Sequence, residues 1–320
     1  MDKHLVSPNP HIHAAVSTES LMRDVIIALL PAIIVSVLFY GWGELLILAV
    51  SALSCVLFEW AIAKFLFKDT ALFCCPAALV TGLLLAMNLP VSTPWWIVVL
   101  GALFAIGVVK MSFGGIGQNV FNPAIAARVF LLVSFPQQMT HWTAPAGFIH
   151  SVDAFSGATL LGQVPVLGAL EADKLVSLQT LLYNIGGSAG EISALALLVG
   201  WAYLLIRRVI KPWITLSIFA TVAVVAGIFH LADPTLYTGP LFNLLTGGVI
   251  LGACFMATDY VTSPMSTWGG VIYGVGIGFL LMMIRYFGSY PEGVSFAILL
   301  MNMTVPLLNR WFHGKKYGRA

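Results

Sequence analysis

The clearest pattern along the chain is a series of long apolar runs separated by short polar turns. A helix that spans a bilayer needs ~20 mostly apolar residues, and this length divides the sequence into ten candidate spans. They cover residues 22–40, 44–67, 71–89, 93–111, 117–135, 190–208, 212–231, 240–258, 267–287 and 292–309. Glycines at 114, 115 and 117 and Pro123 interrupt the fifth run, which predicts a broken helix there.

These runs predict an all-α polytopic membrane protein with about ten transmembrane helices. One long polar stretch falls near the middle and separates two groups of five runs. The predicted organisation is a polar tail at 1–21, five helices within 22–135, a loop at 136–189, five helices within 190–309 and a short tail at 310–320. The first tail lacks the three regions of a signal peptide, so we expect it to be retained.

Two similar segments suggest an internal repeat. Residues 87–94 (Met-Asn-Leu-Pro-Val-Ser-Thr-Pro) follow the third run, and residues 256–264 (Met-Ala-Thr-Asp-Tyr-Val-Thr-Ser-Pro) follow the eighth. Each is preceded by a Thr-Gly pair, which begins at Thr81 and at Thr246. Because runs three and eight are five apart, the copies would be inverted in the membrane. We therefore expect two inverted five-helix repeats; the alternative is that short Pro, Thr and Ser turns end many helices.

The composition supports a membrane location and argues against nucleic-acid binding. The 320 residues are 59% hydrophobic and 9% charged, whereas soluble domains are about 25% charged. The net charge is +2, with no basic stripe that carries interleaved aromatic residues. A nucleic-acid partner is therefore not expected.

The placement of Lys and Arg predicts the orientation, because cytoplasmic loops are enriched in these residues. With a cytoplasmic N-terminus, twelve of them fall inside: Lys3, Arg23, Lys64, Lys68, Lys110, Arg207, Arg208, Lys211, Arg310, Lys315, Lys316 and Arg319. Lys174 and Arg285 fall outside, and Arg128 lies within the fifth run. Both termini are therefore expected in the cytoplasm, and the 136–189 loop outside.

The external loop contains a short segment with a possible chemical role, Ser156-Gly157-Ala158-Thr159. Gly and Ala remove side-chain bulk, so that backbone N–H groups can approach an anion. The Thr159 hydroxyl could form an ester with a phosphate. By itself the tetrapeptide is equally compatible with a plain flexible loop.

Several segments resemble one known family of membrane proteins. Ser156-Gly157-Ala158-Thr159 is similar to the flavinylation motif of the Rnf and Na⁺-translocating NADH:quinone reductase complexes. Segments similar to the RnfD component of Rnf complexes span nearly the whole chain: Ser7-Pro8-Asn9-Pro10-His11, Glu19-Ser20-Leu21-Met22-Arg23-Asp24, Phe121-Asn122-Pro123-Ala124, Phe255-Met256-Ala257-Thr258-Asp259 and Leu299-Leu300-Met301-Asn302-Met303-Thr304-Val305-Pro306-Leu307.

The resemblance implies a specific set of cofactors, partners and location. FMN would be joined through its phosphate to Thr159, and a non-covalent riboflavin would lie nearer the cytoplasm. The protein would take part in electron transfer between NADH and ferredoxin, coupled to Na⁺ or H⁺ translocation, and would not be active alone. Its partners would be the Rnf subunits A, B, C, E and G in the bacterial inner membrane, with a flavin transferase for maturation.

Three other functions stay open. Ala126-Ala127-Arg128 looks closer to NqrB, the related component of the Na⁺-translocating NADH:quinone reductase, although NqrB usually has a longer N-terminal extension. A non-redox solute transporter or channel would also use ten helices, an inverted repeat and broken spans. A purely structural anchor for other subunits is the third alternative.

Further residues are predicted to surround the two flavins. Arg128, an intramembrane charge, could pair with the flavin phosphate, or instead with Asp153 or loop carbonyls. Asn122 and Asp153 are placed in the same FMN environment, as are Ser156, Gly157 and Ala158. The turn with Thr258, Asp259 and Thr262 is predicted to hold the second flavin; the alternative for Asp259 is a helix cap.

The remaining charged residues and cysteines suggest no catalytic or metal site. Glu59 lies near Lys64 and is expected either to relay ions or to snorkel or pair near the inner surface. Asp24 is expected to form an interfacial pair with Arg23. The four cysteines, at 55, 74, 75 and 254, lie in apolar runs without a CxxC pair. They are interpreted as small buried hydrophobic residues. One span contains Gly269, Gly270, Gly274, Gly276 and Gly278. These small residues predict either close helix packing or room for a neighbouring subunit.

Overall fold

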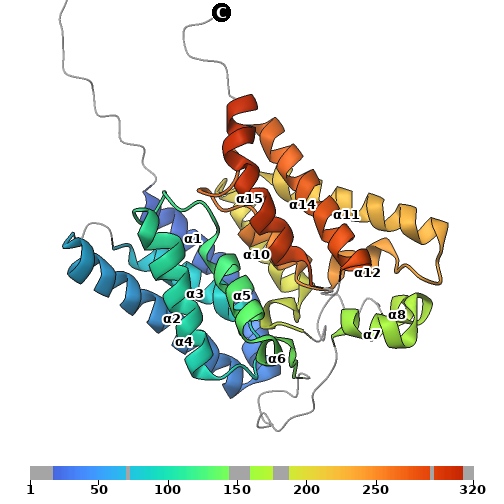
Figure 1. Ribbon diagram of the computed structural model, residues 1–320, viewed down its shortest axis with the longest axis horizontal. Helices are drawn as coiled ribbons and strands as arrows, with labels where there is room; N and C mark the ends of the chain where they lie inside the picture. Colours follow the sequence, from blue (N-terminus) through green and yellow to red (C-terminus); the bar gives the residue numbers. More distant parts are fainter. Residues whose placement is uncertain (1–16, 70–72, 144–158, 176–186, 289–291, 313–320) are drawn as a thin grey trace, which may run out of the picture.

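The computed structural model describes residues 17–69, 73–143, 159–175, 187–288 and 292–312 (Figure 1). Within these ranges every regular element is a helix. Five helical stretches are long and apolar enough to cross a membrane: Thr18–Tyr40, Trp42–Phe67, Trp95–Phe113, Pro212–Ala232 and Thr267–Phe287. Shorter apolar helices cover Cys75–Met87, Pro123–Ser134 and Ala194–Ile206. These elements confirm the helical membrane class predicted from the apolar runs.

The first group of helices precedes the central loop. It comprises α1 (Thr18–Tyr40), α2 (Trp42–Ala61) with its continuation η1 (Ile62–Phe67), α3 (Cys75–Met87), α4 (Trp95–Leu103) with η3 (Phe104–Lys110) and η4 (Met111–Phe113), and α5 (Pro123–Ser134). Gly41 separates α1 from α2 with a φ of 69°, a left-handed conformation that glycine adopts without steric cost.

The second group follows the loop. It comprises α10 (Ala194–Ile206), α11 (Pro212–Ala232), α12 (Pro240–Leu245), α13 (Val249–Leu251) with η6 (Gly252–Met256), α14 (Thr267–Phe287) and α15 (Val294–Trp311). Between the groups, the described residues form four short helices: α6 (Pro136–Thr140), α7 (Leu160–Leu167), α8 (Ala169–Leu175) and η5 (Ala189–Glu191).

Two of the predicted spans are interrupted in the structure. The α-helix of the fifth run begins only at Pro123, after a stretch where Gly114, Gly115 and Gly117 have positive φ, so the predicted break is confirmed. The eighth run was expected to be continuous over 240–258, and this is wrong. Its helix ends at Leu245 and resumes at Val249, because Gly247 and Gly248 both take left-handed conformations.

Helix contacts follow a similar order within each group. In the first group α2 packs against α3 and α4, and α5 contacts α3 and η3. In the second group α11 packs against α12 and α14, and α15 contacts α14 and η6. The groups occupy two sides of the molecule and meet where α1 packs against α10 and α5 against α15 (Figure 1).

Glycines allow the closest helix approaches, as predicted for the run over 267–287. A Cβ atom at Gly274 would collide with the Ser217 Oγ and would lie 2.7 Å from the Ile214 carbonyl oxygen of α11. Large apolar side chains on other faces are exposed, among them Ile34 and Leu38 on α1 and Leu53 and Leu57 on α2. Such a surface suits contact with lipid chains rather than water.

Candidate functional site

Thr159 lies at the start of α7 and caps that helix. Its Oγ1 atom accepts a hydrogen bond from the Gly162 backbone N–H at 3.0 Å, and the residue is 6% exposed. Thr is a good N-cap because its side-chain oxygen satisfies a first-turn N–H group. The other predicted members of the motif, Ser156, Gly157 and Ala158, lie outside the described residues, as does Asp153.

A large cavity lies beside α7. It encloses ≈ 1230 Å³, part of which is open to solvent, between one face of α7 and the region around α12 and the end of α14. Leu161, Gly162 and Pro165 line it on the α7 side. The opposite wall includes Tyr237, Thr238, Asn243, Arg285 and Tyr286. Two tyrosine rings and the Arg285 guanidinium therefore line a cavity whose α7 wall begins at Leu161, two residues after Thr159.

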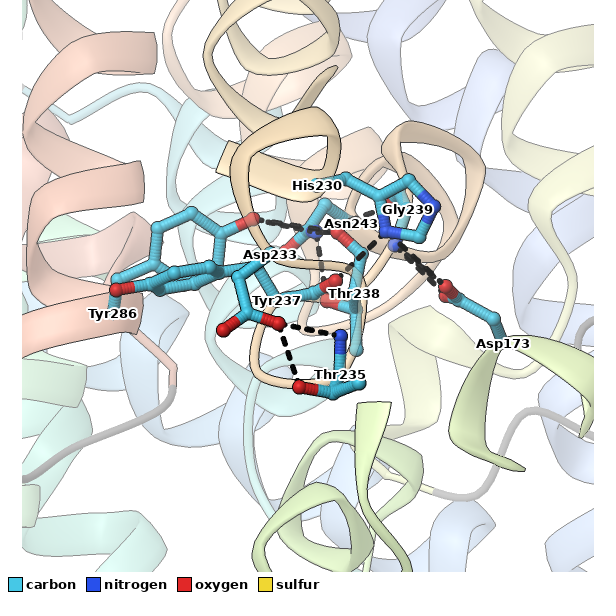
Figure 2. A network of polar contacts seen from close by, with 9 residues as sticks. All are labelled: Asp173, His230, Asp233, Thr235, Tyr237, Thr238, Gly239, Asn243 and Tyr286. Atoms are coloured by element: carbon cyan, nitrogen blue, oxygen red, sulfur yellow. Dashed lines mark hydrogen bonds and ion pairs between the residues drawn. The ribbon is translucent and has the colours of Figure 1, made fainter. Parts of the chain in front are cut away.

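The loop at 233–239, which forms part of this wall, is held by short polar contacts (Figure 2). The Asp233 carboxylate accepts hydrogen bonds from the Thr235 hydroxyl at 2.6 Å and from its N–H at 3.0 Å. These bonds lower the pKa of Asp233. His230 Nδ1 lies 2.8 Å from the Tyr237 carbonyl oxygen.

The same loop is anchored to α8 and α14. Both carboxylate oxygens of Asp173 accept from the Gly239 N–H, at 2.9 and 2.8 Å. The Asn243 amide donates to the Thr238 hydroxyl at 2.9 Å and to the Tyr286 hydroxyl at 3.2 Å (Figure 2). Because three elements converge on one loop, the cavity wall has a defined geometry.

Arg285 supplies positive charge to the cavity wall. Its guanidinium donates to the Asn243 carbonyl oxygen and to the Thr246 carbonyl oxygen, each at 2.6 Å. The Thr246 carbonyl belongs to the break between α12 and α13, so Arg285 satisfies backbone groups that the break frees. The buried Nε atom has no hydrogen-bond partner among the described residues.

Arg128 pairs with Glu292. Its Nη2 atom lies 2.5 Å from a Glu292 carboxylate oxygen, and its Nη1 atom donates to the Ser295 hydroxyl at 3.0 Å and to the Asn88 side-chain oxygen at 3.3 Å. Arg128 is 4% exposed. With its guanidinium engaged in this way, the predicted role toward a flavin phosphate stays a prediction, and so does the alternative partner Asp153.

Asn122 caps α5 and lines a cavity other than the one beside α7. Its side-chain oxygen caps α5 by accepting from the Ala124 N–H at 3.1 Å, and its amide donates to the Met256 carbonyl oxygen at 3.1 Å. Because this cap fixes its direction, Asn122 lines a second cavity rather than the one beside α7.

The second cavity brings together part of the predicted second-flavin turn. It encloses ≈ 760 Å³, part of it open, and its lining includes Asn119, Asn122, Lys110, Thr258 and Asp259. Thr262 is absent from that lining, and its hydroxyl donates to the Asp259 carboxylate at 3.1 Å.

Glu59 forms an ion pair with a residue of another helix. Glu59 is fully buried and pairs with Lys110 at 2.6 Å, not with Lys64, which lies 4.7 Å from the centre of the Trp60 ring. Residues 59 and 64 are five apart, whereas helix faces repeat at three and four.

Asp24 also has partners other than the expected Arg23. It accepts a hydrogen bond from the Tyr203 hydroxyl at 2.9 Å and pairs with Arg207 at 3.4 Å, while Arg23 pairs with Glu19. Adjacent residues of a helix point in different directions, and an i,i+4 partner is therefore favoured for Arg23.

Several site residues were missed by the sequence reasoning. Arg285 was used only to set the orientation, and Lys110 only as a basic residue near the inner surface. Glu44, fully buried in the first turn of α2, was not considered. The sequence pattern indicates all three residues, because an ionisable residue inside an apolar run is a candidate for function.

Known proteins of one family are similar to this chain along almost its whole length. Residues 5–318 match the model of the NQR2, RnfD, RnfE family. The D component of the "Na(+)-translocating ferredoxin:NAD(+) oxidoreductase complex" of Acetobacterium woodii is 43% identical over 316 residues, which cover 98% of this chain and 95% of that protein.

Two further relatives are each named as the D component of an "Ion-translocating oxidoreductase complex". The protein of Stutzerimonas stutzeri is 40% identical over 328 residues, covering 95% of this chain and 93% of the relative. The protein of Escherichia coli O81 is 36% identical over 344 residues, covering 98% of each. The resemblance found in the sequence motifs is therefore confirmed.

Proposed function

The chain belongs to the NQR2, RnfD, RnfE family and is an integral membrane protein, and on this basis we propose that it is the RnfD component of an ion-translocating oxidoreductase complex. The observation that carries the proposal is the 43% and 40% identity, along nearly the whole length, to two proteins named as this component. The complex would transfer electrons between NADH and ferredoxin and couple this transfer to Na⁺ or H⁺ movement, with other subunits as partners.

We further propose that Thr159 carries covalent FMN. An ester at its Oγ1 atom would put a phosphoryl group beside the N–H groups of the first turn of α7, where negative charge is favourable. The adjoining cavity offers Tyr237, Tyr286 and Arg285 to a planar ring. A bound flavin supplies the redox chemistry, and the protein positions it and tunes its surroundings.

The burial of Thr159 bears on how the cofactor is attached. Since the residue is 6% exposed, the flavin transferase must reach the hydroxyl before the surrounding side chains pack, or must displace them. A tether on this side of the protein would keep the flavin from diffusing away.

The inverted repeat is part of the proposal, and two observations support it. Helices that correspond under a shift of five spans make corresponding contacts, such as α2 with α4 and α11 with α14. The two copies of the repeated segment also meet, since the Asn88 amide lies 3.4 Å from the Met256 sulfur. A pseudo-two-fold axis would pass near such a contact.

A second, non-covalent flavin is proposed for the cavity lined by Thr258 and Asp259. This space also exposes Lys110 and Asn119, so polar groups converge on a largely apolar lining. Such a mixture is typical of small-molecule sites. The inner-membrane location, with both termini in the cytoplasm and Thr159 outside, completes the proposal.

Covalent flavin can be tested by denaturing electrophoresis under ultraviolet light. The chain should give a fluorescent band when it is produced with its flavin transferase, and Thr159→Ala should be dark. Thr140→Ala, in the neighbouring α6, is the matched control and should stay fluorescent. A dark band from the unaltered chain under these conditions would favour a non-redox transporter or a structural anchor.

A further inference from the structure

Glu44 is a buried carboxyl group without a partner. It lies in the first turn of α2, is 0% exposed, and neither side-chain oxygen has a hydrogen-bond partner within the described part of the chain. Glu59 on the same helix is equally buried, yet it pairs with Lys110 at 2.6 Å and accepts from the Cys74 N–H at 3.2 Å. The two glutamates therefore differ in pairing and not in burial.

No cation in the packed helices compensates Glu44. Helices α3 and α4, which pack against α2, carry no charged residue. The other elements that pack against α2 each carry a cation with its own partner: Lys110 in η3 pairs with Glu59, Arg23 in α1 pairs with Glu19, and Lys64 in η1 lies over the Trp60 ring. An unpaired carboxylate in such surroundings is far less stable than the neutral acid, because it costs free energy to move an ionised group from water into the protein interior. Glu44 therefore holds a proton.

Two titratable groups, Tyr40 and Glu191, lie between Glu44 and Arg285. The buried Tyr40 ends α1, four residues before Glu44, and its hydroxyl donates to the Gly187 carbonyl oxygen at 2.9 Å. A Cβ atom built on Gly187 would lie 2.7 Å from a carboxylate oxygen of Glu191, so Tyr40 and Glu191 meet at the same glycine.

The other carboxylate oxygen of Glu191 accepts from the Ser188 hydroxyl at 2.7 Å. A Cβ atom built on Gly248 would lie 3.3 Å from that oxygen, and one on the adjacent Gly247 would meet the Arg285 guanidinium.

These contacts define an ordered series from α2 to the cavity beside α7. Glu44 is at one end, Tyr40 and Glu191 follow, and Arg285 lines the cavity. Hydroxyl and carboxyl groups are the side chains that accept and donate protons in membrane relays.

We propose that Glu44 is a proton-binding site of the ion-translocation machinery, and that it exchanges its proton through Tyr40 and Glu191. The use of that proton in translocation rests on the proposed function. The site itself rests on the burial of Glu44, on its unpaired oxygens and on the absence of a counter-ion in α3 and α4.

Dicyclohexylcarbodiimide tests the site in the intact complex, because it reacts with protonated carboxyl groups in apolar surroundings and adds its whole mass. Mass spectrometry should find this mass on the peptide that contains Glu44, with less labelling as the pH rises. Glu44→Gln should remove the label. Glu59, paired with Lys110, and the exposed Glu171 should stay unlabelled.

Three results would overturn the proposal: no label on Glu44 at any pH, labelling of Glu59 instead, or protection of Glu44 by Na⁺ at constant pH. The last would assign a sodium site. Glu44→Gln should also retain the flavin on Thr159 and lose ion translocation, while Glu171→Gln should keep both. A complex without flavin on Thr159 would refute the proposed function but leave the labelling result for Glu44 intact.

Discussion

Single residues near the α7 cavity hydrogen-bond to backbone groups and also determine the charge of the cavity wall. Arg285 does both, since it binds two carbonyl oxygens and leaves one N–H group unused beside the cavity. The two carbonyl oxygens lie at the break between α12 and α13. The Arg285 side chain therefore stabilises the break, and the break holds the Arg285 charge in place.

Replacing Arg285 should therefore change both stability and flavin potential. Arg285→Leu removes two carbonyl partners, which should lower the unfolding free energy by about 1–3 kcal/mol. The loss of positive charge should also make the flavin harder to reduce, so its midpoint potential should become more negative in a potentiometric titration. Lys174→Met, which removes an exposed cation of α8, should leave both quantities unchanged; an unchanged potential in Arg285→Leu would place the flavin elsewhere.

Variants of the buried Arg128–Glu292 ion pair should differ in stability according to whether one or both partners are replaced. Arg128→Met leaves a buried carboxylate without its cation, which should cost about 3–5 kcal/mol of stability in thermal unfolding of the detergent-solubilised protein. Arg128→Met combined with Glu292→Gln should be markedly more stable than the single variant. Equal destabilisation by the single and the double variant would mean that the pair does not interact as the structure shows.

The sequence predicts the role of a residue best when its partners are close to it along the chain. Thr159 could be proposed as a flavin site because its motif is contiguous. The pairs Glu59–Lys110 and Arg128–Glu292 join residues that are 51 and 164 positions apart. No local pattern encodes which distant helix supplies the partner.

Helix boundaries and contacts depend on small residues. Glycine and proline predicted the break before α5, because several of them cluster in a polar stretch. The break between α12 and α13 was missed, because Thr246, Gly247 and Gly248 lie within an otherwise apolar run. There, two adjacent left-handed glycines override the helical preference of the flanking residues.

Two glycines provide a matched test of helix packing. Gly274→Ala would drive a Cβ atom into the Ser217 Oγ, with the Ile214 backbone oxygen also in the way, so it should destabilise the α11–α14 pair. In α11, Gly227→Ala meets only the Pro240 Cγ at 3.7 Å and should be neutral or stabilising by up to about 1 kcal/mol. Thermal unfolding of both variants in detergent would show the difference; equal effects would contradict the packing.

At the scale of the whole molecule, two helix groups meet along α1–α10 and α5–α15, with the paired charges of Arg128 and Glu292 at the second contact. The apolar runs predicted the helices of both groups, since burial in lipid constrains every residue of a span. The cavities were not predicted, because each is formed by elements far apart in the chain.

The orientation of the whole protein can be tested by single cysteines in a cysteine-free background. In intact spheroplasts, a membrane-impermeant maleimide should label Lys174→Cys but not Lys211→Cys. Labelling at 211 should appear only after the membrane is permeabilised, because the excess of Lys and Arg predicts a cytoplasmic side there. The reverse pattern would invert the topology and place Thr159 in the cytoplasm.

The proposed function requires covalent FMN on Thr159. The decisive experiment is mass spectrometry of the peptide that contains Thr159, taken from the complex purified from its own cells. We predict that this peptide carries the added mass of FMN on Thr159 and that fragmentation releases the flavin phosphate. An unmodified Thr159 peptide from an intact, electron-transferring complex would contradict the account.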